Sequence, residues 1–414
     1  MAKKNKPAIR FKEFTDAWEQ RKLGEVVERI TRKNENLEST LPLTISAQYG
    51  LINQNEFFDK RIASKDVSGY FLVRNGEFAY NKSTSSDAPW GAIKRLDSYE
   101  SGVLSTLYIV FKILDERKTS SDYIVTYYNT DLWHKGIQAI AAEGARNHGL
   151  LNVAPADFFE TNLTMPKDYA EQQQIGSFFQ QLDHLITLHQ RKYDKLQVLK
   201  KAMLEKMFPK NGSSVPEIRF KGFTDAWEQR KLGEIAVFSK GVGYSKNDLC
   251  EEGTPIILYG RLYTKYETCI FDVDTFVKEK AGSVYSKGGE VIVPASGETA
   301  EDISIASVVV KPGILLGGDL NIVSPTAEYD SAFLALTISS GATHKYLSSL
   351  AQGKSVVHLH NSDIQSVSAK FPTKREQEKI HLIFGKIDTL ITLHQRELEK
   401  LQNIKKSMLE KMFV

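Results

Sequence analysis

The side chains that could support catalysis or metal binding are few and lie in unsuitable patterns. Gly353-Lys354-Ser355 resembles the end of a phosphate-binding P-loop, but that loop needs a glycine five places before Gly353, where Ser348 stands. His358 and His360 would point to one side of a strand, without a third metal ligand. The twelve prolines include no adjacent pair, which excludes the Asn/Asp-Pro-Pro-aromatic motif of amino-methyltransferases. We therefore expect no catalytic, cofactor-binding or metal site in this chain.

Several loops instead carry side chains that suit nucleic acid. "VRNGEFAYNKSTSSDAPWGAIKR" and "SKGGEVIVPASGETAEDISIASV" each lead a strand through Gly-Glu into a loop rich in Gly, Ser or Thr. "AAEGARNHGLLNV" and "LAQGKSVVHLHNS" each join a short helical run to a glycine-containing loop. Arg, Lys, Asn, Ser and Thr bind phosphates and base edges, although all of these residues could equally be solvated loop side chains. The candidate DNA-binding residues are Asn81, Lys82, Ser83, Thr84, Lys94, Arg95, Arg146, Asn147, His148, Ser296, Thr299, Lys354, Ser355, His358 and His360.

The charge balance is modest for a nucleic-acid-binding protein. The chain has 54 Lys and Arg against 51 Asp and Glu, a formal net charge of +3. Residues 26–170 contain 16 basic and 18 acidic side chains, and residues 235–375 contain 13 and 15, so each interval has a net charge of −2. DNA binding would therefore depend on local basic patches, or be shared with partner subunits.

The elements that must position these loops occur twice. "RFKEFTDAWEQRKLGE" (10–25) returns as "RFKGFTDAWEQRKLGE" (219–234) with one change, and residues 171–208 and 376–413 share 23 of 38 positions without gaps. Repetition on this scale predicts two structural copies related by pseudo-two-fold symmetry. Trp18 and Trp227 inside the repeated box are interpreted as core residues.

Both 38-residue repeats are predicted to be long helices. Neither contains proline, and apolar residues recur at spacings of three and four. Asp168 before Glu171, and Thr373 before Glu376, predict a capping box at each helix start. We expect the helices to pack as an antiparallel coiled coil, with structural or interface roles for the histidines at equivalent positions, His189 and His394. The alternative is that each helix docks separately on its own domain.

The intervals between the repeats contain short β-rich runs broken by turn residues, such as "STLYIVFKIL". The predicted fold class is α+β, with two mixed α/β domains separated by a long antiparallel two-helix coiled coil. The predicted boundaries are a repeat box (1–25), a first domain (26–168), a central helix (169–208), a linker (209–218), a second box (219–234), a second domain (235–373) and a C-terminal helix (374–414).

This arrangement resembles the specificity subunit of type I restriction–modification enzymes over essentially the whole chain. The resemblance implies that both domains are target-recognition domains, each reading one half of a split, asymmetric DNA site. It implies that the helices fix the unread spacer and dock two modification (methyltransferase) subunits, which restriction subunits then join. Adenine methylation with S-adenosylmethionine, and cleavage driven by ATP with Mg²⁺, would belong to those partners. This chain would be non-catalytic and hold no cofactor.

Two other functions are compatible with the sequence. A pseudo-dimeric coiled-coil scaffold would join protein partners without reading DNA, and an autonomous repressor would bind DNA alone. The repressor is disfavoured because the chain has no clear helix-turn-helix and a low net charge. Without an apolar run near eighteen residues or a signal-peptide pattern, and with only Cys250 and Cys269, we expect a cytoplasmic protein without disulfides.

Overall fold

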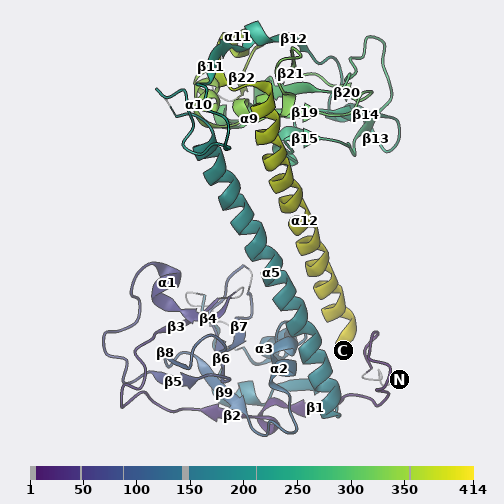
Figure 1. The fold of residues 1–414 in the computed structure, drawn as a ribbon. Helices are drawn as coiled ribbons and strands as arrows, with labels where there is room; N and C mark the ends of the chain where they lie inside the picture. Colours follow the sequence, from purple (N-terminus) through teal and green to yellow (C-terminus); the bar gives the residue numbers. More distant parts are fainter. Residues whose placement is uncertain (1–5, 47–48, 87, 142–148, 211, 354–355) are drawn as a thin grey trace. The chain divides into compact units, whose positions relative to one another are not determined.

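The chain folds into two compact units, each containing parts of both long helices. The computed structural model describes residues 6–414 except 47–48, 87, 142–148, 211 and 354–355. The first unit comprises Met1–Leu188 with Leu398–Val414, and the second comprises His189–Glu397 (Figure 1). Helices α5 (Tyr169–Met207) and α12 (Lys374–Met412) have 39 residues each, so the two long helices predicted from sequence are present. No helix in the described part of the chain is long and apolar enough to cross a membrane.

The first unit is a mixed α/β structure. Its strands are β1 (Glu19–Lys22), β2 (Val27–Ile30), β3 (Leu43–Ser46), β4 (Gly50–Asn53), β5 (Phe71–Arg74), β6 (Phe78–Asn81), β7 (Ala92–Arg95), β8 (Ser101–Leu104), β9 (Ile109–Ile113) and β10 (Asn162–Met165). Its short helices are the 3₁₀ turn Leu23–Glu25, α1 (Gln54–Phe58), α2 (Ser121–Tyr127), α3 (His134–Ile140) and α4 (Pro155–Phe159). The main sheet has the order β2-β9-β6-β7, and three antiparallel pairs join β1 to β10, β3 to β4 and β5 to β8.

The main sheet of the first unit is buried on both faces. Alternate side chains of a strand point to opposite sides, so Phe78 and Tyr80 of β6 enter one hydrophobic cluster while Ala79 enters another. Phe111 of β9 stacks on Phe78 with ring centroids 5.2 Å apart. Strand β6 therefore holds the beginning of the loop that follows it on a rigid support.

The second unit has the same plan with additional strands. Its strands are β11 (Glu228–Lys231), β12 (Ala236–Lys240), β13 (Leu249–Cys250), β14 (Thr254–Ile257), β15 (Cys269–Ile270), β16 (Phe276–Val277), β17 (Glu290–Pro294), β18 (Ser296–Gly297), β19 (Ser307–Val309), β20 (Leu315–Leu316), β21 (Leu320–Pro325), β22 (Val357–His358) and β23 (Ser368–Phe371). Its short helices are α6 (Leu232–Ile235), the 3₁₀ turn Lys246–Asp248, α7 (Arg261–Thr264), α8 (Ala300–Ile303), α9 (Ser331–Ile338), α10 (Gly341–Leu350) and α11 (Asn361–Ser366). The main sheet has the order β12-β21-β17-β19-β15, and a second has the order β13-β16-β14-β20.

The repeated box is tied to the start of the helix that follows its domain. In the first unit, Nε and Nη2 of Arg10 donate to the two carboxylate oxygens of Glu171 at 2.6 and 2.7 Å. In the second unit, Arg219 makes the same bidentate contact with Glu376 at 2.8 and 2.8 Å. Both glutamate side chains are 1% exposed. Each pair joins the first residue of the repeated box to the first residue of the repeated helix stretch.

These ion pairs overturn the predicted capping boxes. The carboxylates of Glu171 and Glu376 were expected to bond back to the helix starts, but both accept from arginines far away in sequence. Asp168 does cap α5, because its carboxylate accepts from the backbone N–H of Ala170 at 2.8 Å. The sequence pattern was therefore only half informative, since a buried glutamate gains more from a bidentate guanidinium than from a single amide.

A repeated glutamine ties each long helix to a short helix of the domain. Gln172 accepts from the backbone N–H of Ser120, the residue before α2, at 2.9 Å. Gln377 accepts from the backbone N–H of Asp330, the residue before α9, at 2.9 Å. Both glutamines are 1% exposed. Helices α2 and α9 are therefore held in the same way in the two units.

Within each unit the two long helices pack antiparallel. In the first unit, Asp183 near the start of α5 pairs with Lys405 near the end of α12 at 2.5 Å. In the second unit, Lys200 near the end of α5 pairs with Asp388 near the start of α12 at 2.5 Å. Also in the second unit, Nδ1 of His394 lies 3.2 Å from Nδ1 of His189, so this histidine pair is an interhelical contact. The predicted antiparallel packing is confirmed inside each unit.

The glycines of the two long helices make a matched pair for testing this packing. A Cβ at Gly176 would lie 2.7 Å from Cβ of Asp122 and 2.9 Å from its backbone carbon, at the start of α2. A Cβ at Gly385 would meet nothing within 4 Å. Gly176→Ala should therefore lower the free energy of unfolding by about 1–3 kcal/mol, whereas Gly385→Ala should raise it by about 0.5–1 kcal/mol. Urea unfolding followed by helical circular dichroism measures both changes, and equal effects would contradict the close packing of α2 on α5.

Candidate nucleic-acid interface

In the first unit, the structure brings together two of the loops singled out by sequence. The first loop pair consists of residues 81–84, which begin at the last residue of β6, and residues 149–151. The backbone N–H of Leu151 donates to the carbonyl oxygen of Lys82 at 2.9 Å. The backbone N–H and the hydroxyl of Thr84 both donate to the carbonyl oxygen of Gly149, at 2.6 and 2.9 Å. The candidates Arg146, Asn147 and His148 lie outside the described residues.

The second unit has its own loop pair, which we define as residues 295–299 and 357–360. Strands β18 and β22 pair antiparallel, with Ser296 opposite His358. The hydroxyl of Ser296 lies 3.1 Å from Nδ1 of His358. The backbone N–H of Leu359 donates to the carbonyl oxygen of Ala295 at 3.1 Å. The candidates Lys354 and Ser355 lie outside the described residues.

The two loop pairs occupy equivalent places. Lys82 follows the Gly-Glu of its strand by the same number of residues as Ala295, and the carbonyls of both accept from a buried leucine, Leu151 or Leu359. In both units the second loop then leads into a short helix, α4 or α11. The same backbone scaffold therefore presents different side chains in the two units.

The positive groups of the first unit differ in how freely they could contact a ligand. Burial lowers the pKa of Lys82, whose side chain is half-buried at the first loop pair. Burial, together with the charge of Lys405, also lowers the pKa of Lys94, which donates to Oδ1 of Asn129 at 2.9 Å. Arg95 is only 14% exposed and pairs with Asp97 at 2.6 Å. Lys94 and Arg95 therefore also brace β7 against neighbouring elements.

Arg95 has a further structural contact at the start of α2. Its Nη1 lies 2.8 Å from the carboxylate of Asp122 and 2.7 Å from the hydroxyl of Ser121. These contacts favour a structural role for its guanidinium.

The candidates of the second unit are partly exposed and partly structural. The rings of His358 and His360 are nearly parallel, 4° apart, with centroids separated by 6.5 Å, and both residues are exposed. Ser296 is buried, and its carbonyl oxygen accepts from the hydroxyl of Tyr263 at 2.5 Å. The hydroxyl of Thr299 accepts from the backbone N–H of Asp302 and caps α8. Tyr263 was missed by sequence reasoning, because no local pattern connects it with Ser296.

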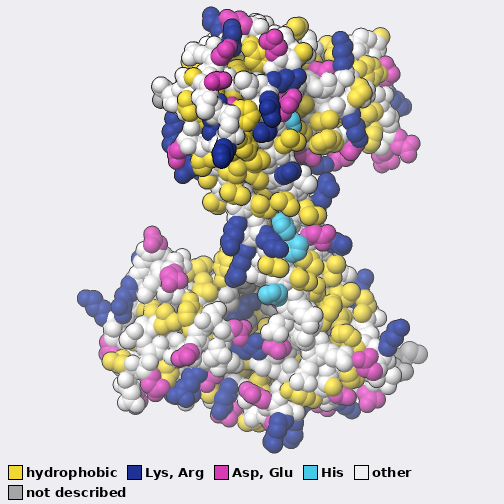
Figure 2. All heavy atoms as spheres, in the orientation of Figure 1, with side chains coloured by type: hydrophobic (Ala, Val, Ile, Leu, Met, Phe, Trp, Pro, Cys, Tyr) yellow, Lys and Arg dark blue, Asp and Glu magenta, His cyan; other side chains and the backbone are white. Residues whose placement is uncertain are grey.

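Charges of both signs are mixed on the face of each unit that is visible in Figure 2. Lysine and arginine side chains are interspersed with acidic ones on that face of each unit. Among the described residues, no group of three or more His, Cys, Asp and Glu side chains could hold a metal ion. The loop pairs offer hydrogen-bonding groups, the exposed imidazoles of His358 and His360, and the half-buried Lys82, which are side-chain types that suit contacts with phosphates and base edges.

Comparison with known families relates the second unit to a described domain. The family model described as "Type I restriction modification DNA specificity domain" matches residues 224–403. Residues 224–403 of this chain are therefore similar to that specificity domain. The match covers residues 224–234 of the second repeat box, the second loop pair and most of α12, and it supports the resemblance inferred from the repeats over this part of the chain.

Two relatives extend the similarity beyond the matched specificity domain. The type I restriction enzyme MjaVIII specificity subunit of Methanocaldococcus jannaschii is 21% identical over 412 residues, which cover 95% of this chain and 91% of that subunit. The crystal structure of a type I restriction-modification system S subunit from M. genitalium has a TM-score of 0.66 at 14% identity and covers 99% of both chains. The fold of this chain is therefore similar to that of the S subunit.

Proposed function

We propose that this chain is the DNA sequence-recognition subunit of a type I restriction–modification complex. Each loop pair reads one half of a bipartite, asymmetric DNA site. The observation that carries this proposal is the equivalent placement of the two loop pairs, on one scaffold but with different side chains. The specificity-domain match over residues 224–403 supports it. The scaffold alternative is not favoured, because neither the family description nor the varied loop side chains suit it.

The remaining functions are assigned to partners. Two modification subunits would dock on the long helices and methylate adenine with S-adenosylmethionine, and restriction subunits would cleave DNA with ATP and Mg²⁺. The net charge of −2 in each domain interval agrees with a grip on DNA that is shared among subunits. This subunit itself would be non-catalytic, work in the cytoplasm and set the unread spacer with its long helices.

The test is to co-express the chain with its cognate modification subunit and map adenine methylation across the genome by single-molecule sequencing. We expect a motif with two short defined halves around a fixed gap. Lys82→Ala should reduce discrimination in one half and His358→Ala in the other, each by about tenfold, whereas Lys12→Ala in the repeated box should change neither. A continuous motif would refute the two-reader proposal, and an assembled complex that does not methylate DNA would favour the scaffold.

A further inference from the structure

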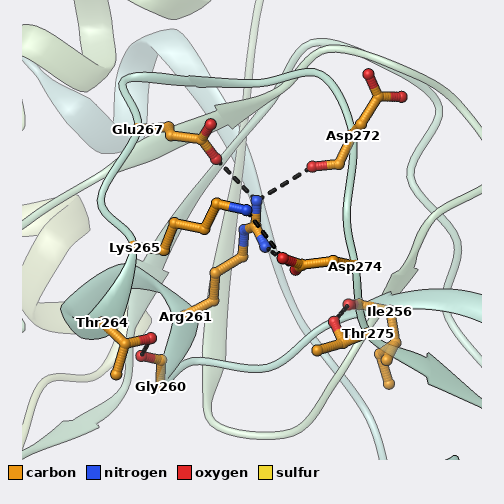
Figure 3. Close-up of polar contacts among 9 residues, drawn as sticks. All are labelled: Ile256, Gly260, Arg261, Thr264, Lys265, Glu267, Asp272, Asp274 and Thr275. Atoms are coloured by element: carbon orange, nitrogen blue, oxygen red, sulfur yellow. Dashed lines mark hydrogen bonds and ion pairs between the residues drawn. The ribbon is translucent and has the colours of Figure 1, made fainter. Parts of the chain in front are cut away.

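A buried arginine organises the segment that supports the second loop pair. Nη1 of Arg261 lies 2.8 Å from the carboxylate of Asp274, and its Nη2 lies 2.8 Å from the carboxylate of Glu267 (Figure 3). Nη2 also donates to the carbonyl oxygen of Asp272 at 3.1 Å. The Arg261 side chain is only 7% exposed. Because its planar fork is fixed by three acceptors, the guanidinium sets the shape of residues 261–274, which we call the brace segment.

Asp274 of the brace segment remains ionised at neutral pH. Lys265 donates to the second oxygen of Asp274 at 2.9 Å, and this hydrogen bond lowers the pKa of Asp274 to about 2 (Figure 3). At the base of the segment, the hydroxyl of Thr275 donates to the carbonyl oxygen of Ile256 in β14 at 2.6 Å. The network therefore connects the brace segment to the sheet of its own unit.

At one end, the brace segment contacts the second loop pair directly. The hydroxyl of Tyr263, in α7, donates to the carbonyl oxygen of Ser296 at 2.5 Å. A Cβ at Gly297 would lie 3.0 Å from that hydroxyl, so β18 passes close to Tyr263. Burial raises the pKa of Tyr263, which keeps the hydroxyl protonated as a donor. Ser296 is the residue opposite His358 in the loop pair.

Farther along, the brace segment contacts the long helices within the same unit. The hydroxyl of Thr268 donates to Oδ2 of Asp388 in α12 at 2.8 Å. The other oxygen of Asp388 pairs with Lys200 of α5 at 2.5 Å. Nζ of Lys200 also lies 5.8 Å from the ring centroid of Tyr266. The brace segment thus joins the ion pair between the two long helices to the backbone of the second loop pair.

We propose that Arg261 and Tyr263 are positioning residues that fix the second loop pair relative to the long helices for DNA reading. This inference rests on the proposed function. Neither Arg261 nor Tyr263 is proposed to contact DNA. Arg261 fixes α7, and Tyr263 in α7 fixes the carbonyl group of Ser296. The hydroxyl of Ser296 in turn fixes the ring of His358. Direct readout needs the base-contacting side chains to be held in register with the DNA groove. A loosened loop therefore loses discrimination between bases before it loses electrostatic affinity for DNA.

The test is a binding selection with the full chain assembled with its modification subunit. The probe is a library of duplexes randomised over both halves of the site and the gap, sequenced after binding. Tyr263→Phe removes only the hydroxyl, and Arg261→Gln removes the charge. We expect each to lower the ratio of specific to non-specific binding about tenfold, with relaxed base preference in one half-site only. Binding to a non-specific duplex at the same salt concentration should not change.

Tyr266→Phe is the matched control, because its hydroxyl donates to Ala306 at 3.3 Å and not to the loop pair. This variant should keep the wild-type selection. The wild-type complex could select a two-part motif that Tyr263→Phe leaves unaltered. That result overturns the positioning role, while the proposed function stands. Relaxed preference in both halves also overturns it, since a general loss of structure would then explain the result. A wild-type complex that selects no sequence overturns both proposals.

Discussion

Replacement of Arg219 by methionine is expected to destabilise the second unit by about 3–5 kcal/mol. The reason is the burial of its partner: the Glu376 side chain is 1% exposed, and Arg219 satisfies both of its carboxylate oxygens. Without the guanidinium, a carboxylate would remain in a site closed to water, and removing charges from water is costly unless they are paired. Arg10 and Glu171 make the corresponding pair in the first unit, where Trp18 donates a further hydrogen bond at 3.2 Å.

Hydrogen exchange measured by mass spectrometry gives the local readout that this prediction needs. Amides of β11 and β23 report on the second unit, and amides of β1 and β10 serve as an internal reference in the first. Arg219→Met should abolish most protection in β11 and β23 and leave β1 and β10 protected.

Two further variants separate the buried charge from the loss of an arginine. Arg230→Met breaks a surface ion pair with Glu228 and should leave stability nearly unchanged, because the two side chains are 50% and 70% exposed. The double variant Arg219→Met/Glu376→Leu removes the unpaired carboxylate and should regain most of the loss. A double variant as unstable as Arg219→Met would mean that packing, and not the buried charge, explains the effect.

The repeats in the sequence predicted the long helices and the repeated boxes better than they predicted the loops. The helices could be recognised because the period of their apolar residues is a local property, and the repeated box because two copies were available for comparison. The Arg10–Glu171 pair could have been read from the sequence, since an arginine and a glutamate stand at the same two places in both copies. We missed it because the capping box offered a local partner for the glutamate.

The contacts of the loops had no such signal. Tyr263 and Ser296 are 33 positions apart, so no local sequence pattern connects them. The Gly-Glu landmark noted in both halves of the sequence does lie at equivalent places, because a buried glutamate, Glu77 or Glu290, sets the turn at the start of β6 or β17. Which side chains face a ligand depends on long-range pairing between strands, which a single sequence does not encode locally.

Phe413→Ala is expected to destabilise the first unit by about 3–5 kcal/mol, although it changes the residue next to the end of the chain. The ring of Phe413 is 6% exposed and contacts three aromatic rings: Trp18 at 5.9 Å, Tyr123 at 5.7 Å and Phe179 at 6.1 Å between centroids. Just before it, the carbonyl oxygen of Lys411 accepts from the backbone N–H of Ile9 at 3.0 Å.

The second unit repeats this arrangement with Phe208, whose ring lies 5.9 Å from Trp227, 5.4 Å from Phe333 and 6.3 Å from Phe384. The carbonyl oxygen of Lys206 accepts from the backbone N–H of Ile218 at 2.9 Å. The core of each unit is thus completed by the end of the long helix that begins in the other unit. Phe208→Ala should therefore resemble Phe413→Ala, with its effect in the second unit.

Hydrogen exchange of the two phenylalanine variants tests whether each core depends on the end of the helix that begins in the other unit. Phe413→Ala should expose the last turns of α12 and the strands β1 and β10, and Phe208→Ala should expose the last turns of α5 and the strands β11 and β23. Leu393→Ala, at a side chain 50% exposed in the middle of α12, should change protection by no more than about 0.5 kcal/mol. If Phe413→Ala leaves β1 and β10 as protected as in the wild type, the first unit closes its core without α12. The repeated "LEKMF" would then need an explanation other than packing.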